Sequence, residues 1–371
     1  GVRNGRCRAA AVLAQVTVAA GRNELLTTRQ ETIFFDTVLD CRAPSLPILR
    51  EEDQAGLDVV HVAYSSDAGN FAGLLSSMLS LGSHLSAPGL CYIHLIVTED
   101  DAFQAQELAA CFQRELAMLP AIPTIVLHEL RPLPIDFSAL APHPVYQRLW
   151  TPHTFARLYL HEYLPAVRRV IWLDFDTIVR CDLGQLYRMR MRHALAAANE
   201  WGNGTFDPYR RMVKPRLRAR FPPPGRRIFN SGVLVLDLDR WRSEAIPKQI
   251  DSLLPLFAGI NGEQLLLNLA VQQYDRLDWR WNAMGMFLTL EMPELCINGA
   301  KILHWTWDNK PWIEDRSEEF RRHDDLFEPY RPRQQCPAAH GLRRWTRIAS
   351  RKPRSLATGS QAATDILKNH L

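Results

Sequence analysis

A short apolar run that ends in two aspartates constrains this chain more than any other feature. Val170 to Leu173 are all apolar, which is typical of a strand buried on both faces of a parallel sheet. Asp174 and Asp176 follow directly, with Phe175 between them. If the strand continues, alternation places both carboxylates on one face and Phe175 on the other. Open α/β sheets bind ligands at the carboxyl ends of their strands, so this position favours a functional site.

The two carboxylates need a positive partner or full solvation. Two like charges a few ångströms apart repel by about 4 kcal/mol at an effective dielectric constant of about 20. A hard divalent metal is the natural partner for such a pair. The alternative is a pair of strand-end acids that face water.

The composition is that of an ordinary globular protein. The chain has 371 residues, of which 47% are hydrophobic and 23% are charged. This length allows one large α/β domain with appendages, or two domains. The net charge of +4 is too small to indicate a nucleic-acid partner. Basic residues gather in two stretches, with eight Lys or Arg against one Asp in 202–227 and nine against one in 331–371. Such runs are usually solvated loops or tails, and the alternative is attraction to acidic lipid or to an anionic acceptor.

The cysteines and one glycosylation motif bear on the compartment. Seven cysteines show no Cys-x-x-Cys pair and no metal spacing, and their odd number leaves the redox compartment open. Asn203-Gly204-Thr205 is a glycosylation sequon, which fits a secretory protein. Ala9 to Ala20 is too short an apolar stretch to cross a bilayer. Because the sequence begins with Gly, we expect that an N-terminal targeting or anchoring segment is missing and that the protein works near a membrane.

The hydrophobic periodicity predicts an ordered domain over residues 57–330. Residues 1–56 carry no strong periodicity and are expected to form a stem or linker. Strands at 59–64, 91–97 and 124–130 alternate with helices at 71–85 and 102–119, which predicts a right-handed parallel sheet with helices on both faces. Further helices are predicted at 151–164, 183–191, 241–257 (in parts) and 262–271, and further strands at 170–173, 193–199, 228–237 and 302–305.

Two stretches are predicted to lie outside the core. Residues 202–227 contain five prolines and the first basic cluster, so they are interpreted as an insertion or mobile loop. Past Pro329 the apolar periodicity ends, so we expect a basic, disordered tail over 331–371.

Four motifs occur in a fixed order along the predicted domain. They are Asp174-Phe175-Asp176, Phe229-Asn230-Ser231-Gly232-Val233, Gly262-Glu263-Gln264, and His304 followed by Lys310-Pro311-Trp312. This order resembles glycosyltransferase family 8, retaining enzymes that use nucleotide sugars and a manganese-dependent Asp-x-Asp motif. The resemblance covers about residues 59–312. It implies an α/β fold of the GT-A type, a Rossmann-like, mixed but mainly parallel sheet flanked by helices.

The resemblance implies a metal site and a phosphate-binding residue. Asp174, Asp176 and His304 would coordinate Mn²⁺, which would also hold the diphosphate of a UDP-sugar donor. Lys310 would bind phosphate as a point charge. The alternatives are a packed core histidine for His304 and an ordinary loop lysine for Lys310.

The resemblance also implies donor-binding residues. Arg157 matches a family arginine that contacts the donor, against the alternative of an ion pair on a helix surface. Asn230 would hydrogen-bond the donor sugar or the acceptor, against the alternative of a turn residue at a strand start. The other expected donor-binding residues are Ser65, Ser66, Asp67 and Asn70 for uracil and ribose, with Phe175 and Ser231 inside the motifs.

Glu263, Gln264 and Lys310 are the expected catalytic residues. The family has an acid followed by a glutamine at this point, close to the anomeric carbon of the donor. An amide is a poor nucleophile, so a same-face substitution through an oxocarbenium-like ion pair is expected. The metal and Lys310 would stabilise the departing UDP. The alternative for Glu263 is a helix-cap role.

The sequence departs from the family pattern in the expected sugar pocket. Many members have an acid at Ser65 or Ser66, an acid in place of Leu265, and a glycine in place of Trp307. The donor sugar therefore stays open among glucose, galactose, xylose and galacturonic acid, and the acceptor among a glycan, a protein and a lipid. Family habit and the sequon together favour the lumen of the Golgi or the secretory pathway, with the cytoplasm as the alternative.

Two other functions fit part of the sequence. Leu173-Asp174-Phe175-Asp176-Thr177 also resembles the nucleophile motif of haloacid-dehalogenase-type phosphatases, in which Asp174 would be phosphorylated. That family opens its domain with this strand, whereas three predicted strands precede it here. The second alternative is an inert family member that serves as a binding or priming subunit. The presence of every metal and phosphate residue argues against it.

Overall fold

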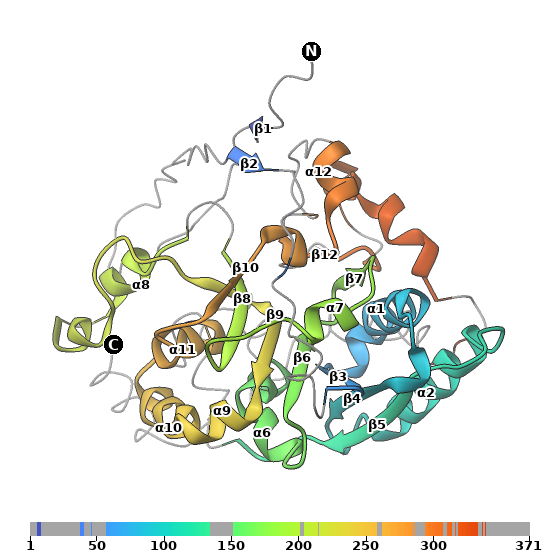
Figure 1. The fold of residues 1–371 in the computed structure, drawn as a ribbon, viewed down its shortest axis with the longest axis horizontal. Helices are drawn as coiled ribbons and strands as arrows, with labels where there is room; N and C mark the ends of the chain where they lie inside the picture. Colours follow the sequence, from blue (N-terminus) through green and yellow to red (C-terminus); the bar gives the residue numbers. More distant parts are fainter. Residues whose placement is uncertain are drawn as a thin grey trace, which may run out of the picture.

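A seven-stranded sheet forms the centre of the fold in the computed structural model (Figure 1). The structure describes residues 6–8, 38–40, 46, 57–133, 151–200, 204–213, 215–257, 262–284, 286, 294–306, 310–313, 316, 318–332, 336 and 338. In sheet order the strands are β10 (Asp275–Leu277), β8 (Leu195–Asn199), β9 (Phe229–Asp237), β6 (Arg169–Leu173), β3 (Val60–Ser65), β4 (Cys91–Val97) and β5 (Thr124–Glu129).

One strand of this sheet runs against the others. β9 pairs antiparallel with both β6 and β8, while all other pairs are parallel. The prediction of a mixed, mainly parallel sheet is therefore confirmed. Every residue of β6 and of β9 is buried, as the continuous apolar run before Asp174 predicts for strands covered on both faces.

Helices cover both faces of the sheet, which makes three layers (Figure 1). One face carries α1 (Phe71–His84), α2 (Ala102–Glu115) and α7 (Gly184–Tyr187), whose apolar side chains share a core with strand residues such as Val62 and Ile93. The other face carries α5 (Pro152–Phe155), α6 (Leu160–Tyr163), α9 (Leu238–Ser243), α10 (Ile246–Phe257) and α11 (Gly262–Ala270).

A small second sheet extends the edge where the strands end. It consists of β11 (Ala283–Met284), β12 (Ile302–His304) and β7 (Thr177–Val179), and α12 (Glu294–Gly299) lies between β11 and β12 in the sequence. Trp305, Trp312 and Phe327 form a third apolar cluster beside it. Near the start of the chain, β1 (Arg6–Arg8) and β2 (Val38–Asp40) pair as an antiparallel ribbon.

The basic insertion is folded, so the prediction of a mobile loop outside the core is wrong. It contains α8 (Asp207–Met212) and a 3₁₀ helix over Pro215–Arg220. Phe206, Val213 and Phe221 are buried in the core that lies under α10 and α11. The sequence did not reveal this, because prolines and arginines separate the three buried apolar residues and no apolar period is visible. The sequon at Asn203 lies outside the described residues.

Two other predictions need correction. The predicted helix over 151–164 is two short α-helices, α5 and α6, separated by a 3₁₀ segment over Ala156–Tyr159, whose tighter turns do not follow the α-helical period. The predicted disorder does not begin at residue 331, because Cys336 is buried in the core on the α1 and α2 side. The rest of the tail lies largely outside the described residues. Within the described part of the chain, we find no helix with the length and apolarity that crossing a bilayer requires.

Candidate active site

Three strand ends meet at one edge of the large sheet. Because β9 is reversed, its amino end lies beside the carboxyl ends of β6 and β8. Leu173, the last residue of β6, pairs with Val233, and Asn199, the last residue of β8, pairs with Phe229. The Asn230-Ser231-Gly232 motif is therefore placed next to both strand ends, where ligands of α/β sheets usually bind.

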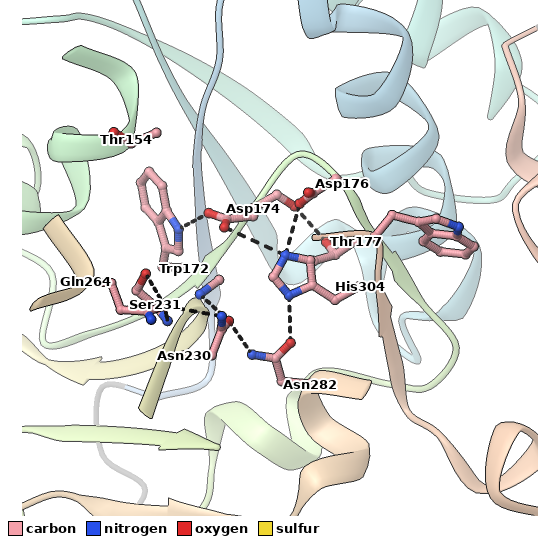
Figure 2. A network of polar contacts seen from close by, with 12 residues as sticks. Thr154, Trp172, Asp174, Asp176, Thr177, Asn230, Ser231, Gln264, Asn282 and His304 are labelled. Carbon is pink, nitrogen blue, oxygen red and sulfur yellow. Dashed lines mark hydrogen bonds and ion pairs between the residues drawn. The ribbon is translucent and has the colours of Figure 1, made fainter. Parts of the chain in front are cut away.

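The three expected metal ligands converge at this edge. Asp174, Asp176 and His304 each offer a ligand atom, and these atoms lie within 4.8 Å of one another. His304 Nε2 is 3.1 Å from Asp176 Oδ1 and 3.8 Å from Asp174 Oδ2 (Figure 2). β12 carries His304 there, because it runs antiparallel to β7 and pairs His304 with Thr177.

The carboxylates converge through a turn and not through strand alternation, so that part of the prediction is wrong. β6 ends at Leu173, and the chain then turns. Both the backbone N–H and the hydroxyl of Thr177 donate to the carbonyl oxygen of Asp174, at 3.2 Å and 2.8 Å. The turn directs both acids to the same side, while the Phe175 ring packs edge-on against Trp312, with centroids 6.0 Å apart.

A hydrogen bond fixes how His304 faces the acids. Its Nδ1 lies 2.8 Å from Asn282 Oδ1, and Asn282 Nδ2 in turn donates to Asn230 Oδ1 at 2.9 Å (Figure 2). Because this amide oxygen can only accept, Nδ1 donates to it, and Nε2 faces the carboxylates. Asp176 Oδ1 is buried and has no hydrogen-bond donor. One ring nitrogen and one oxygen of each carboxylate thus face one another, an arrangement that a cation would satisfy.

Gly232 leaves the space in which the ligands meet. A methyl group at this position would overlap His304 Cε1 and would lie 2.9 Å from Asp174 Oδ2. The glycine of the Asn-Ser-Gly motif therefore permits the imidazole and the carboxylate to approach each other across β9.

Lys310 contacts the second carboxylate oxygen of Asp176. Its ammonium donates to Asp176 Oδ2 and, at 2.6 Å, to the carbonyl oxygen of Trp305. Burial alone would raise the pKa of the Asp176 carboxyl, but Lys310 and His304 together outweigh burial and hold this pKa well below its usual range. The ammonium also lies 5.8 Å from the centroid of the Phe175 ring. Lys310 is thus a buried cation of the site and not an ordinary loop lysine.

Arg157 is buried in the site and does not form the surface ion pair considered as its alternative. Its guanidinium lies 2.9 Å from Asp174 Oδ1 and 3.5 Å from Glu263 Oε1, and it donates to the carbonyl oxygen and the hydroxyl of Ser231. It also lies 4.7 Å from the ring centroid of Trp172, whose Nε1 donates to Asp174 Oδ1 at 2.9 Å. These contacts orient Asp174. Contact between Arg157 and a donor stays a prediction.

Gln264 is held in place by three neighbours. Its Oε1 accepts from Asn230 Nδ2 at 3.2 Å and from the Ser231 backbone N–H at 3.1 Å, and its Nε2 donates to Glu200 Oε2 at 2.8 Å. The adjacent Glu263 accepts from the Ser231 hydroxyl at 3.1 Å. Burial raises the pKa of the Glu263 carboxyl, and nearby Arg157 opposes the rise. Glu263 therefore belongs to the buried polar network as well as to the first turn of α11.

The residues expected to hold uracil and ribose follow the neighbouring strand. Ser65 ends β3, and its hydroxyl donates to the carbonyl oxygen of Ile96 at 2.8 Å. Asn70 donates to the carboxylate of Asp67, and Ser66 donates to the carbonyl oxygen of Asp67. β3 pairs with β6, so this group lies at the same sheet edge as Asp174. Its printed hydrogen bonds do not reach the metal-ligand cluster, and nucleotide binding stays a prediction.

Three residues of the site were missed from the sequence. Glu200 follows a buried strand directly, which is the signal that identified Asp174, so it could have been found. Trp172 was interpreted only as a core residue of its strand. Asn282 lies beside short elements with no periodicity of their own, so nothing in the sequence pointed to it.

Comparison with known proteins identifies the family. Residues 61–316 match the family described as Glycosyl transferase family 8. The chain belongs to glycosyl transferase family 8. Membership makes it a glycosyltransferase and implies a nucleotide-sugar donor and a glycan acceptor. The phosphatase interpretation is set aside by this match and by the three strands that precede β6.

Individual relatives and solved structures support the family assignment and the fold. Probable galacturonosyltransferase-like 3 of Arabidopsis thaliana is 25% identical over 289 residues, which cover 73% of this chain and 80% of the relative. The WbbM bifunctional glycosyltransferase has a TM-score of 0.55 at 15% identity, covering 84% of this chain and 54% of that one. An active-site mutant of LgtC has a TM-score of 0.53 at 18% identity, covering 73% and 95%. These structures show the GT-A fold of the chain and confirm the predicted fold class.

Proposed function

We propose that this family 8 enzyme is a Mn²⁺-dependent, retaining glycosyltransferase that moves a hexosyl or pentosyl unit from a UDP-sugar to a hydroxyl of a glycan, protein or lipid. The observation that carries the proposal is the convergence of Asp174, Asp176 and His304 from distant parts of the chain, with Lys310 beside them. As the site of action we propose the lumen of the Golgi or of the secretory pathway.

The donor atoms fit manganese. Two carboxylates and one neutral imidazole form a mixed oxygen and nitrogen set that suits Mn²⁺. Asp176 Oδ1, buried without a hydrogen-bond donor, is the atom that such an ion would satisfy. Mn²⁺ bound by Asp174, Asp176 and His304 would supply positive charge for the diphosphate leaving group.

Lys310 complements that charge. Without a donor its ammonium is held by Asp176 and by the Trp305 carbonyl oxygen. Charge neutralisation of Asp176 by a metal would release the ammonium toward a phosphate oxygen, where it would stabilise the departing UDP as a point charge. The uridine would lie toward Ser65, Ser66, Asp67 and Asn70.

The geometry of Gln264 favours transfer without a covalent enzyme intermediate. Its amide oxygen already accepts hydrogen bonds from Asn230 and from the Ser231 backbone, and its nitrogen donates to Glu200. The amide is thus a weak nucleophile, and its oxygen and nitrogen already form hydrogen bonds with neighbouring residues. We propose that it lines the sugar pocket while an oxocarbenium-like ion pair forms, with a phosphate oxygen of the leaving UDP accepting the proton of the attacking hydroxyl on the same face.

UDP release across a panel of UDP-sugars, with and without Mn²⁺, tests the proposal. We expect metal-dependent release that Asp176→Ala abolishes and that His304→Ala lowers by about a hundredfold. Direct Mn²⁺ binding, followed by electron paramagnetic resonance, should weaken in both variants. The matched control is Asp100→Ala. Asp100 is an exposed aspartate in the turn that precedes α2. Release of inorganic phosphate from simple phosphoesters, or UDP binding without turnover, would contradict the proposal.

A further inference from the structure

The basic insertion begins and ends at the active site. The chain leaves the site at Glu200 and returns to it at Asn230, and both side chains contact Gln264. Gly204, the first described residue of the excursion, packs so closely on Glu200 that a methyl group there would lie 2.8 Å from Glu200 Cγ. The backbone N–H of Glu200 donates to the Ile228 carbonyl oxygen, which ties the two ends of the excursion together.

The insertion has a fixed shape. Phe206 and Phe221 are buried and pack edge-on, with ring centroids 6.1 Å apart. Arg210 donates to the carbonyl oxygen of Pro222, and the Asp207 carboxylate accepts from the Gly225 backbone N–H. Because apolar anchors and internal hydrogen bonds hold the segment, its charged side chains project from a preformed surface.

The charge of this surface is almost entirely positive. Among its described residues, seven Arg stand against one Asp, and the carboxylate of that Asp is already occupied within the segment. Arg211, Arg218 and Arg220 are exposed. Burial raises the pKa of the Tyr274 phenol, and Arg276 of β10 opposes the rise together with Arg226 and Arg227 of the insertion. The Tyr274 hydroxyl itself donates to Asn199, the residue before Glu200.

Among its described residues, the insertion exposes no large hydrophobic side chain. The exposed large hydrophobic side chains of the described residues are Leu90, Tyr92, Phe103, Met118, Leu119 and Ile313, and all of them lie outside the insertion. A basic surface whose described residues include no exposed large hydrophobic side chain to enter the acyl region fits a hydrated polyanion better than a bilayer.

We propose that residues 204–213 and 215–227 form a basic platform that holds an anionic glycan acceptor beside Gln264. This inference rests on the proposed glycosyl transfer and specifies its acceptor class. The platform lies on the Glu200 side of Gln264, whereas Lys310 and the metal ligands lie on the other side of Asn230, so donor phosphates and acceptor charges would have separate partners. The arginines would attract the acceptor and hold its charged groups while one of its hydroxyls faces the donor.

Direct binding of an acidic and a neutral form of one glycan tests the inference. The probes are a linear oligogalacturonate and its fully methyl-esterified form, which has the same length without the charge. Calorimetric titration of the full chain with Mn²⁺ and UDP should show at least about tenfold tighter binding of the acidic form, decreasing with salt. The triple variant Arg211→Gln, Arg218→Gln, Arg220→Gln should lose this preference.

A matched triple variant distinguishes the effect of charge in the insertion from the effect of the net charge of the protein. Arg114→Gln, Arg190→Gln and Lys248→Gln remove the same charge from exposed positions outside the insertion and should leave the preference intact. Equal binding of both glycan forms, equal loss in both triple variants, or binding to phosphatidylserine vesicles without binding to the acidic glycan would each overturn the inference. The titration needs no turnover, so the proposed function, tested by UDP release, can fail separately.

Discussion

At the scale of single residues, Gly232 controls whether the metal ligands can meet. A methyl group there would overlap the His304 ring and crowd Asp174. We expect Gly232→Ala to weaken Mn²⁺ binding by about tenfold or more, since displaced ligands lose affinity, and to lower UDP release with it. Electron paramagnetic resonance of bound Mn²⁺ measures the first effect directly. Gly89→Ala is the control, because the nearest atom to its new methyl group is Ala121 Cβ at 3.3 Å. Unchanged Mn²⁺ affinity in Gly232→Ala would show that the ring has room to move.

The site residues that could be predicted from the sequence have charged or titratable side chains at recognisable positions. Asp174, Asp176, His304 and Lys310 are charged or titratable side chains beside predicted strand ends or in ordered motifs, and the structure brings them together. Asn282 was not predictable. Its role comes from a hydrogen bond to His304 across two short strands, a contact that depends only on tertiary packing.

At the scale of secondary-structure elements, three neighbouring strands share a row of histidines. His61 on β3, His94 on β4 and His128 on β5 are hydrogen-bonded in sequence, at 2.9 Å and 3.0 Å between ring nitrogens. Burial, with the neighbouring His61 and His128, lowers the pKa of His94 to about 3. Burial also lowers the pKa of His61 and of His128. Folded His94 therefore stays neutral in mildly acidic solution.

This row should make folding sensitive to acid. Unfolded histidine has a pKa of about 6.5, so below that pH the unfolded chain binds protons that folded His94 does not. Its stabilising contribution is complete above pH 6.5 and is lost as the pH falls toward 3, by about 1.4 kcal/mol per pH unit. We expect the urea concentration at the unfolding midpoint to decrease as the pH is lowered from 7.5 to 5.5. This decrease should be smaller in His94→Asn. Identical slopes in the two proteins would refute this assignment.

Prediction succeeded for elements that are mostly buried and are bounded by turn residues. The bounds of β4 are those predicted, because Pro88 and Gly89 lie just before its largely apolar run and Thr98 follows it. It failed where local geometry serves the site. The stretch 151–164 breaks into short turns that place Arg157 in the buried network, and the chain turns after Leu173 to aim both acids at His304.

At the scale of the whole molecule, α1 and the C-terminal segment meet at Gly73. A methyl group there would overlap the buried ring of Trp312, two residues after Lys310. We expect Gly73→Ala to lower the free energy of unfolding by about 1–3 kcal/mol, and to weaken UDP binding because Lys310 moves with Trp312. Gly82→Ala, which crowds Leu116 instead, should lose stability without weakening UDP binding. Thermal melting and UDP titration separate the two outcomes. Equal UDP affinity in both variants would contradict the coupling.

The overall architecture was predictable because strand and helix signals alternate in the first half of the chain and four motifs follow in order. The shape of the basic insertion was not. Its apolar anchors Phe206, Val213 and Phe221 are separated by many polar residues, so no window of the sequence shows a helical or strand period. Only their common burial against distant helices reveals that the segment is folded.

The pairing of β12 with β7, which lies far earlier in the sequence, has a consequence for folding during synthesis. Lys310 follows Asp176 by 134 residues, and His304 is nearly as late. At ordinary translation speeds the two aspartates therefore leave the ribosome about ten seconds before their basic partners exist. The complete three-residue cation site cannot help the earlier strands to assemble. These strands must find their order through apolar contacts and backbone hydrogen bonds. The cation site is therefore completed late in folding.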